Sequence, residues 1–259
     1  MALVRFNDVT VDYPIFTSHT RSIKTALFSR LGGRLASHNN TVIVRALENI
    51  NVELNDGDRL ALIGHNGDGK TTFLRVASRI YEPQIGSVDI HGNVSSFTDL
   101  TLGMDIEATG WENITFRCIF MGLTFAEARE LAPSIAEFSE LGDYLDMPVR
   151  TYSTGMFLRL AFAISTAIPH DIIVMDELIN AGDASFADKA EKRLEELIGN
   201  TNILLLATHY LGIITKLCNK ALWLEHGRIK ALGPASDVLN AYVESVAAGK
   251  QAETGAAVS

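Results

Sequence analysis

Cysteine, positive charge and long apolar runs are all scarce in this sequence of 259 residues. Two cysteines, Cys118 and Cys218, are too few for a disulfide framework or a zinc cage, and they favour a reducing compartment. Lys and Arg total 22 against 31 Asp and Glu, and the formal net charge of −9 argues against a protein that wraps nucleic acid. No stretch reaches the roughly 18 uninterrupted apolar residues that span a bilayer, and the N-terminus lacks a signal peptide pattern. If this protein acts at a membrane, we therefore expect it to be recruited there.

The apolar fraction, by contrast, is large enough for a packed core. Hydrophobic residues make up 47% of the chain and charged residues 20%, which excludes a disordered or fibrous protein. Apolar runs predict strands over residues 2–12, 41–54, 59–64, 87–92, 171–177 and 202–209, and a hairpin over 220–233 turning at His226 and Gly227. Helices are predicted over about 70–80 and 186–198, a mainly helical region over about 99–165, and a disordered tail over 247–259.

A glycine-rich segment, GHNGDGKT at residues 64–71, satisfies the pattern G-x-x-x-x-G-K-[ST]. It follows an apolar strand and opens a predicted helix, where glycines and the helix N-terminus can surround phosphates with N–H groups. We expect Lys70 to reach the β- and γ-phosphates of a nucleotide and the Thr71 hydroxyl to bind Mg²⁺. The alternative is a chance glycine-rich turn. An acid, Asp68, stands inside this anion-binding loop. Its N–H can still donate if the carboxylate points outward, and we expect its charge to weaken nucleotide binding.

Polar residues also follow two later apolar strands. Asp176 and Glu177 end the run DIIVMDE, and His209 ends NILLLATH. The carboxyl ends of parallel strands are where open α/β sheets bind ligands. Asp176 suits the water shell of Mg²⁺, and Glu177 is a candidate general base for an attacking water. His209 is either a structural histidine or a sensor hydrogen-bonded to the γ-phosphate.

The segment Tyr152–Met156 stands directly before a predicted helix. Its serine and glycine can form an N-cap and a second anion-binding turn. Taken alone, an ordinary N-cap is the simpler interpretation.

A basic segment interrupts the acidic chain. Residues 14–46 contain no Asp or Glu, and an apolar residue recurs every four positions from Ile23 to Leu35, which predicts an amphipathic helix over about 18–36. Its basic side chains are Arg21, Lys24, Arg30 and Arg34. The helix is either an ordinary solvated surface helix or one that lies at an anionic membrane or a phosphorylated ligand.

Taken together, these residues resemble the nucleotide-binding subunit of an ATP-binding cassette (ABC) transporter over about residues 2–245. The P-loop, signature, Walker B motif, D-loop and switch histidine follow in the family's order at Gly64–Thr72, Tyr152–Met156, Ile172–Glu177, Ala181–Asp183 and His209. The usual signature is Leu-Ser-Gly-Gly-Gln, and here Ser153 and Gly155 match it. The variant Tyr-Ser-[Ser/Thr]-Gly-Met looks like the branch that exports capsule, O-antigen and teichoic-acid chains on a lipid carrier. The segments 181–186 and 109–113, and the long stretch between residues 13 and 42, also look like that branch.

The resemblance implies an α/β fold: a P-loop NTPase core with an antiparallel β subdomain and a helical subdomain, in one nucleotide-binding domain over residues 1–246. It implies ATP and Mg²⁺ as cofactors. The implied ATP-binding residues are Tyr13, Gly64, His65, Asn66, Gly67, Asp68, Gly69, Lys70, Thr71 and Thr72. The implied metal residues are Thr71, Asp99 and Asp176, and the implied catalytic residues are Glu177 and His209. Tyr13 stacks on adenine in this assignment, and Asp99 takes the place of the Q-loop glutamine.

The resemblance also implies partners. Ser153, Thr154, Gly155 and Met156 contact the ATP of a second copy in a head-to-tail dimer, with Asp183 in the D-loop. An integral membrane permease moves the lipid-linked glycan, which the basic helix also approaches, so the chain works peripherally at the cytoplasmic face of the inner membrane. Nucleic acid is not an expected partner. Because the sequence ends at Ser259, we expect no appended carbohydrate-binding domain.

Two other functions compete with transport. A soluble ABC ATPase of DNA repair or translation usually has two cassettes or a long coiled-coil insertion, and this sequence has neither. A P-loop kinase leaves Ser153–Met156 and His209 unexplained.

Overall fold

A computed structural model describes residues 1–15, 35–38, 41–98, 100–177 and 184–256. The chain divides into two compact units. The first contains residues 1–95, 171–177 and the chain from Asn202 onward, and the second contains residues 96–170 together with helix α6 (Ala184–Gly199). The helical region predicted at about 99–165 lies within the second unit. The basic helix predicted over about 18–36 lies outside the described residues, except that Leu35 and Ala36 begin a strand.

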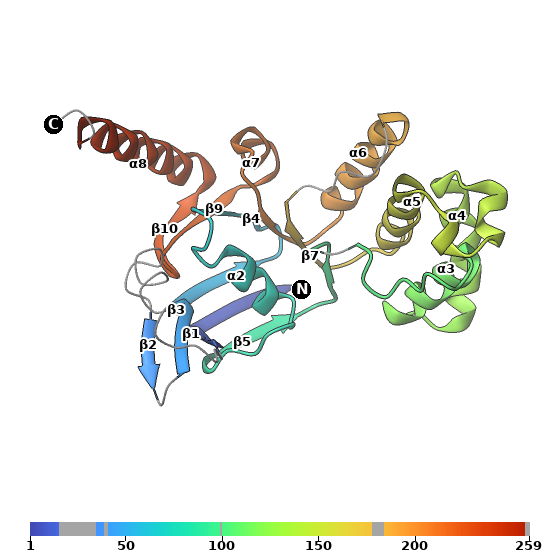
Figure 1. Ribbon diagram of the computed structural model, residues 1–259, viewed down its shortest axis with the longest axis horizontal. Coiled ribbons are helices and arrows are strands. Elements are labelled where there is room, and N and C mark those ends of the chain that lie inside the picture. The colour runs from blue at the N-terminus through green and yellow to red at the C-terminus, as the bar shows by residue number, and fades with distance from the viewer. Residues whose placement is uncertain (16–34, 39–40, 99, 178–183, 257–259) are drawn as a thin grey trace. The chain divides into compact units, whose positions relative to one another are not determined.

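An antiparallel sheet forms one layer of the first unit, as predicted. Its strands are β1 (Leu3–Ile15), β2 (Leu35–His38), β3 (Thr41–Asn55) and β5 (Ile85–His91), in the order β2-β3-β1-β5. Strand β1 pairs with both neighbours, so that Phe6 stands opposite Val52 of β3 and Val88 of β5. Figure 1 shows these strands side by side.

The second sheet has the order β10-β9-β4-β8-β7-β6. Its strands are β4 (Arg59–Ile63), β6 (Val94–Ser96), β7 (Ile172–Asp176), β8 (Ile203–Ala207), β9 (Lys220–Glu225) and β10 (Arg228–Pro234). Strands β9, β4, β8 and β7 run parallel, and their register sets Ala207 beside both Leu62 and Asp176. The carboxyl ends of β4, β7 and β8 therefore meet at one edge of the sheet, where the predicted site residues follow them.

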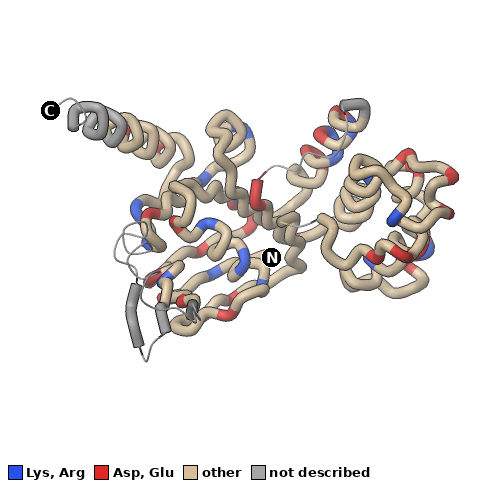
Figure 2. Tube along the Cα trace, viewed as in Figure 1, with Lys and Arg blue, Asp and Glu red and all other residues tan. Residues whose placement is uncertain are grey.

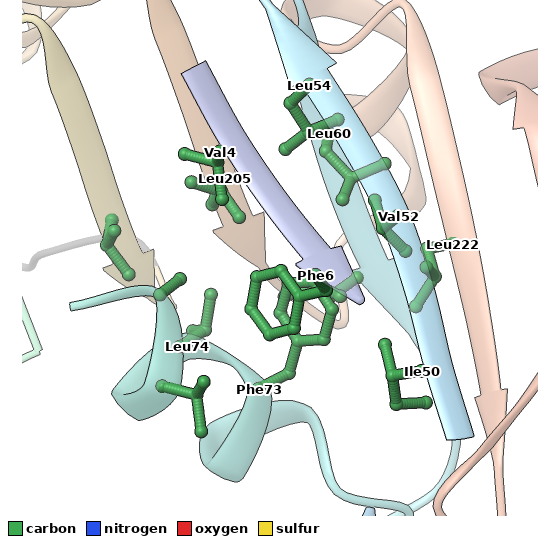
Figure 3. Close-up of a cluster of buried hydrophobic side chains, with 14 of the residues drawn as sticks. Val4, Phe6, Ile50, Val52, Leu54, Leu60, Phe73, Leu74, Leu205 and Leu222 are labelled. Carbon is green, nitrogen blue, oxygen red and sulfur yellow. The ribbon is translucent and has the colours of Figure 1, made fainter. Parts of the chain in front are cut away.

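The main core joins the two sheets through helix α2 (Lys70–Ala77). Phe73 of α2 stacks on Phe6 of β1 with ring centroids 4.4 Å apart, and both side chains are buried (Figure 3). Leu205 and Leu222 of the parallel sheet pack into the same cluster. A helix of eight residues is marginal by itself, so α2 depends on this burial for its stability.

The second unit is helical. It contains α3 (Gly110–Phe120), α4 (Phe125–Ser139), 3-10 turns at Gly142–Asp146 and Val149–Thr151, α5 (Thr154–Ser165) and α6, with α3, α4 and α5 grouped together in Figure 1. Capping boxes begin α3 at Thr109 and α4 at Thr124, each with a glutamate three residues later. Acidic and basic residues are mixed along α6, as on a solvated helix face (Figure 2).

Two helices complete the first unit, α7 (Leu211–Leu217) and α8 (Ala235–Ala256). Val238 and Leu239 in the first turns of α8 are buried. The helix continues to Ala256, through the region where the sequence predicted a tail from residue 247. Within the described ranges, no helix has the length and apolar character to cross a membrane.

Candidate functional site

The glycine-rich loop lies between β4 and α2, as its pattern predicts. Gly64 and Gly69 have φ values of 144° and 103°, which side chains rarely adopt. A Cβ at Gly64 would lie 2.3 Å from the carbonyl oxygen of Leu224, and one at Gly69 would lie 2.5 Å from that of Ala46. Glycine is therefore required both for the turn and for the close approach of the loop to β9 and β3.

The Lys70 side chain folds back across this loop. Its Nζ donates hydrogen bonds to the carbonyl oxygens of Gly64 at 2.7 Å and His65 at 2.9 Å. The residue is 9% exposed, and burial lowers the pKa of its amine while nearby carboxylates oppose that shift. The amine is thus held over the loop, where it can exchange carbonyl partners for phosphate oxygens.

Thr71 and Asp176 meet across 105 residues of sequence. The Thr71 hydroxyl donates to Oδ2 of Asp176 at 2.8 Å. A hydroxyl and a carboxylate are the oxygen ligands that Mg²⁺ uses beside phosphates and water. In the described part of the chain, no cluster of three or more His, Cys, Asp or Glu could hold a metal ion.

Glu177 and His209 lie side by side past the ends of β7 and β8. The Glu177 N–H donates to the carbonyl oxygen of Ala207 at 2.7 Å, which continues the strand pairing by one residue. Its φ of 71° is left-handed, a strained conformation for glutamate. His209 Nε2 lies 3.9 Å from Glu177 Oε1, and the two side chains are 52% and 65% exposed. Both groups can therefore reach water and a ligand at this edge.

Tyr13 lies beside the first turn of α2. Its hydroxyl is 3.5 Å from Oγ1 of Thr72, and its ring packs nearly perpendicular to Tyr81 at 5.3 Å. Nothing in the sequence marks Tyr81, because an aromatic residue after a helix carries no signal of its role.

Asp68 does not point outward, which was the condition under which the sequence left its N–H free to bind an anion. Its side chain is buried at 4% exposure. The carboxylate accepts a hydrogen bond from the N–H of His65 at 2.7 Å and another from the N–H of His226 at 2.8 Å. No local sequence signal could have identified His226, which is 158 residues away.

The signature segment lies in the second unit. The Ser153 hydroxyl accepts a hydrogen bond from the N–H of Met156 at 3.2 Å and caps α5, as predicted. Tyr152 donates its hydroxyl proton to the carbonyl oxygen of Tyr144 at 2.7 Å. Asp99 and Asp183, also predicted for the site, lie outside the described residues.

A glycine-rich loop at the carboxyl edge of a parallel sheet, beside a Thr–Asp pair and a glutamate, defines a P-loop nucleoside triphosphatase. The family model described as ABC transporter matches residues 47–180. The chain is 44% identical over 231 residues to the O-antigen export system ATP-binding protein RfbE of Yersinia enterocolitica, covering 88% of this chain and 97% of that protein. It is 32% identical over 243 residues to the teichoic acids export ATP-binding protein TagH of Listeria monocytogenes, covering 94% and 70%.

The fold is that of a solved ATP-binding cassette, a dimer in a post-hydrolysis state bound to ADP and Pi. The TM-score is 0.64 at 18% identity, and the match covers 90% of this chain and 98% of that one. The chain belongs to the ABC transporter family. It binds and hydrolyses ATP, as the sequence predicted.

Proposed function

We propose that this chain is the ATP-hydrolysing subunit of a transporter that exports a lipid-linked polysaccharide. The observation that carries the proposal is the 44% identity, over nearly the whole of both chains, to a protein named for O-antigen export. A relative named for teichoic acids export and the signature Tyr-Ser-Thr-Gly-Met support the same substrate class. The proposed place of work is the cytoplasmic face of the inner membrane, on an integral membrane permease.

ATP binding uses the loop of residues 64–72. The Lys70 amine leaves the carbonyl oxygens of Gly64 and His65 and contacts the β- and γ-phosphates. Tyr13 stacks on adenine, and its perpendicular contact with Tyr81 holds the ring in place.

Hydrolysis takes place at the carboxyl edge of the parallel sheet. Mg²⁺ bound with ATP supplies charge neutralisation, and Thr71 and Asp176 are the described residues that would hold it. Glu177 orients and deprotonates the attacking water, for which its exposed carboxylate is accessible. His209, 3.9 Å from Glu177, donates a hydrogen bond to the γ-phosphate in this proposal. Asp99 remains a proposed further contact to Mg²⁺ or the water.

The second copy of the chain completes each site in this proposal. Ser153–Met156 of one copy contact the ATP held by the other, and the N–H groups that begin α5 suit a phosphate. Asp183 is proposed to lie at the same dimer interface. The solved relative with this fold is a dimer.

An apolar face of α3 is the proposed contact with the permease. Phe116, Ile119 and Phe120 are 49%, 42% and 73% exposed, and their spacing places them on one helix face. The opposite face, with Ile114 and Cys118, is buried in the helical unit. Large exposed apolar side chains gathered on one face mark a protein contact, and an export ATPase needs a membrane subunit as its partner.

The basic segment is proposed to contact the membrane or the phosphates of the lipid-linked substrate. Each basic side chain at an anionic surface contributes roughly 1 kcal/mol. Replacing Arg21, Lys24, Arg30 and Arg34 by Gln should spare ATPase activity and complex assembly but impair export. Normal export by this variant would favour the alternative interpretation, an ordinary solvated surface helix.

Complementation in cells lacking this chain tests the proposed function. The wild-type chain should restore surface polysaccharide and co-purify with an integral membrane protein, whereas the Glu177→Gln variant should co-purify but leave the lipid-linked glycan inside. Restored ATPase activity without any change in surface polysaccharide would favour a soluble ATPase instead.

A further inference from the structure

The P-loop is attached to the turn of the β9–β10 hairpin through one side chain. Asp68 Oδ2 accepts from the N–H of His65, within the loop, and Oδ1 accepts from the N–H of His226, at the turn. The main chain adds a third contact, because the carbonyl oxygen of Asp68 accepts from the N–H of Gly227 at 3.1 Å. A buried carboxylate thus joins two backbone segments that are far apart in sequence.

The turn itself has an unfavourable conformation that these contacts stabilise. His226 and Gly227 have φ values of 52° and 75°, the geometry of a two-residue hairpin turn that usually contains Asn or Gly. A positive φ is uncommon for any residue other than glycine, although histidine adopts it more often than most, and the surrounding contacts offset its cost. The N–H of Glu48 donates to the carbonyl oxygen of Gly227 at 2.8 Å, so the turn is held on β3 as well as on the P-loop.

The same contacts set the shape of the loop. Asp68 bends back to the His65 N–H in the first half of the loop, and the loop backbone approaches β9 so closely that Gly64 has no room for a Cβ. A phosphate-binding loop works when its N–H groups are oriented before the anion arrives, since ordering them on binding would cost affinity. The Asp68 carboxylate is satisfied by two N–H donors, His226 Nδ1 lies 3.6 Å from its Oδ1, and its charge also acts on the Lys70 amine.

We infer that Asp68 is a positioning residue, which fixes the P-loop on the His226–Gly227 turn in its phosphate-binding shape. The inference rests on the proposed role of residues 64–72 as the phosphate-binding loop, and it does not depend on the exported substrate. It reverses the expectation from charge alone, in which removing an acid from an anion site improves ATP binding.

Two substitutions separate positioning from charge repulsion. Asp68→Ala removes both acceptors, and Asp68→Asn keeps the size but presents an NH₂ group to one of the two N–H donors. Both remove the negative charge, so repulsion predicts equal or tighter ATP binding. Positioning predicts that the Kd for ATP rises about tenfold or more in both, with kcat at saturating ATP within about twofold of wild type.

Asp58 provides the matched control. It is also a buried acid, at 9% exposure, and it accepts from the N–H of Asn55 at 2.9 Å and from Lys220 at 2.8 Å, at the end of β4 away from the P-loop. Asp58→Ala should lower stability without changing the Kd for ATP. If it weakens ATP binding as much as the Asp68 variants do, general destabilisation explains the effect and the inference fails.

Amide hydrogen exchange without nucleotide gives a second readout. The amides of His65, His226 and Gly227 should be protected in the wild type and lose protection selectively in Asp68→Asn. Rapid exchange of the His65 and His226 amides in the wild type, or ATP binding by both Asp68 variants as tight as wild type, would overturn the inference. The Lys70→Ala variant tests the site itself. If its ATP affinity equals that of the wild type, residues 64–72 are not the phosphate-binding loop. The exchange experiment would still test whether Asp68 holds the loop on the His226–Gly227 turn.

Discussion

Replacing Glu177 by Gln isolates its proposed chemical role from its structural one. The side chain is 65% exposed, and His209, 3.9 Å away, is 52% exposed, so this pair contributes less than about 0.5 kcal/mol to folding. Gln has the same size, and the backbone N–H bond to Ala207 is unaffected. The loss of a general base should slow hydrolysis about 10²–10⁴-fold, which is roughly 3–5 kcal/mol of barrier.

Phosphate release under saturating ATP measures this rate, and calorimetry measures ATP affinity, which should stay within about twofold of wild type because the loop and Lys70 are intact. A stable ATP-bound dimer should accumulate on size exclusion. Glu107→Gln is the control, since Glu107 is 70% exposed and pairs with Arg150 in the helical unit. Hydrolysis by Glu177→Gln at the wild-type rate would show that Glu177 is not the base.

Three further predictions concern the metal, the core and a thiol. Thr71→Val removes the hydroxyl with little change in volume, and the Mg²⁺ concentration for half-maximal ATPase activity should rise about tenfold; an unchanged Mg²⁺ titration would contradict the role of Thr71. Phe73→Ala breaks the buried stack on Phe6 and should lower the free energy of unfolding, measured by urea denaturation, by about 3–5 kcal/mol. A loss under about 1 kcal/mol would mean that the core collapses around the gap. Burial raises the pKa of Cys218 to about 12, so at pH 8 its thiol stays protonated and native protein should react with iodoacetamide far more slowly than unfolded protein; rapid labelling of the native state would refute this.

The helix ends show where the sequence pattern was informative and where it was not. Thr109 and Thr124 each precede a glutamate by three residues, and both begin helices with complete capping boxes. Ser153 caps α5 for the same local reason. Such caps depend on neighbouring residues alone, so a sequence determines them well. The extension of α8 to Ala256 was not predicted, because small residues such as those after 246 are compatible with both helix and coil.

Local chemistry likewise made the P-loop predictable. Gly64 and Gly69 adopt backbone angles that favour glycine, Lys70 begins the helix, and the apolar runs of β4, β7 and β8 become buried strands. The resemblance built on these motifs then gave the ABC transporter family, which the comparisons confirmed.

Contacts between distant residues were decided by tertiary structure. The sequence by itself determined that Asp176 and Glu177 end an apolar run and that Asp68 and Thr71 lie in the glycine-rich segment. Spacing along the chain is a local property. Only the packing of α2 against β7 brought the Thr71 hydroxyl to 2.8 Å from Asp176. Only the closing of the β9–β10 hairpin against the P-loop gave the Asp68 carboxylate a second N–H donor, at His226, and so turned an apparently unfavourable charge into a buried, doubly hydrogen-bonded contact. The direction of a carboxylate depends on which donors surround it, and those donors come from parts of the chain that meet only in the folded protein.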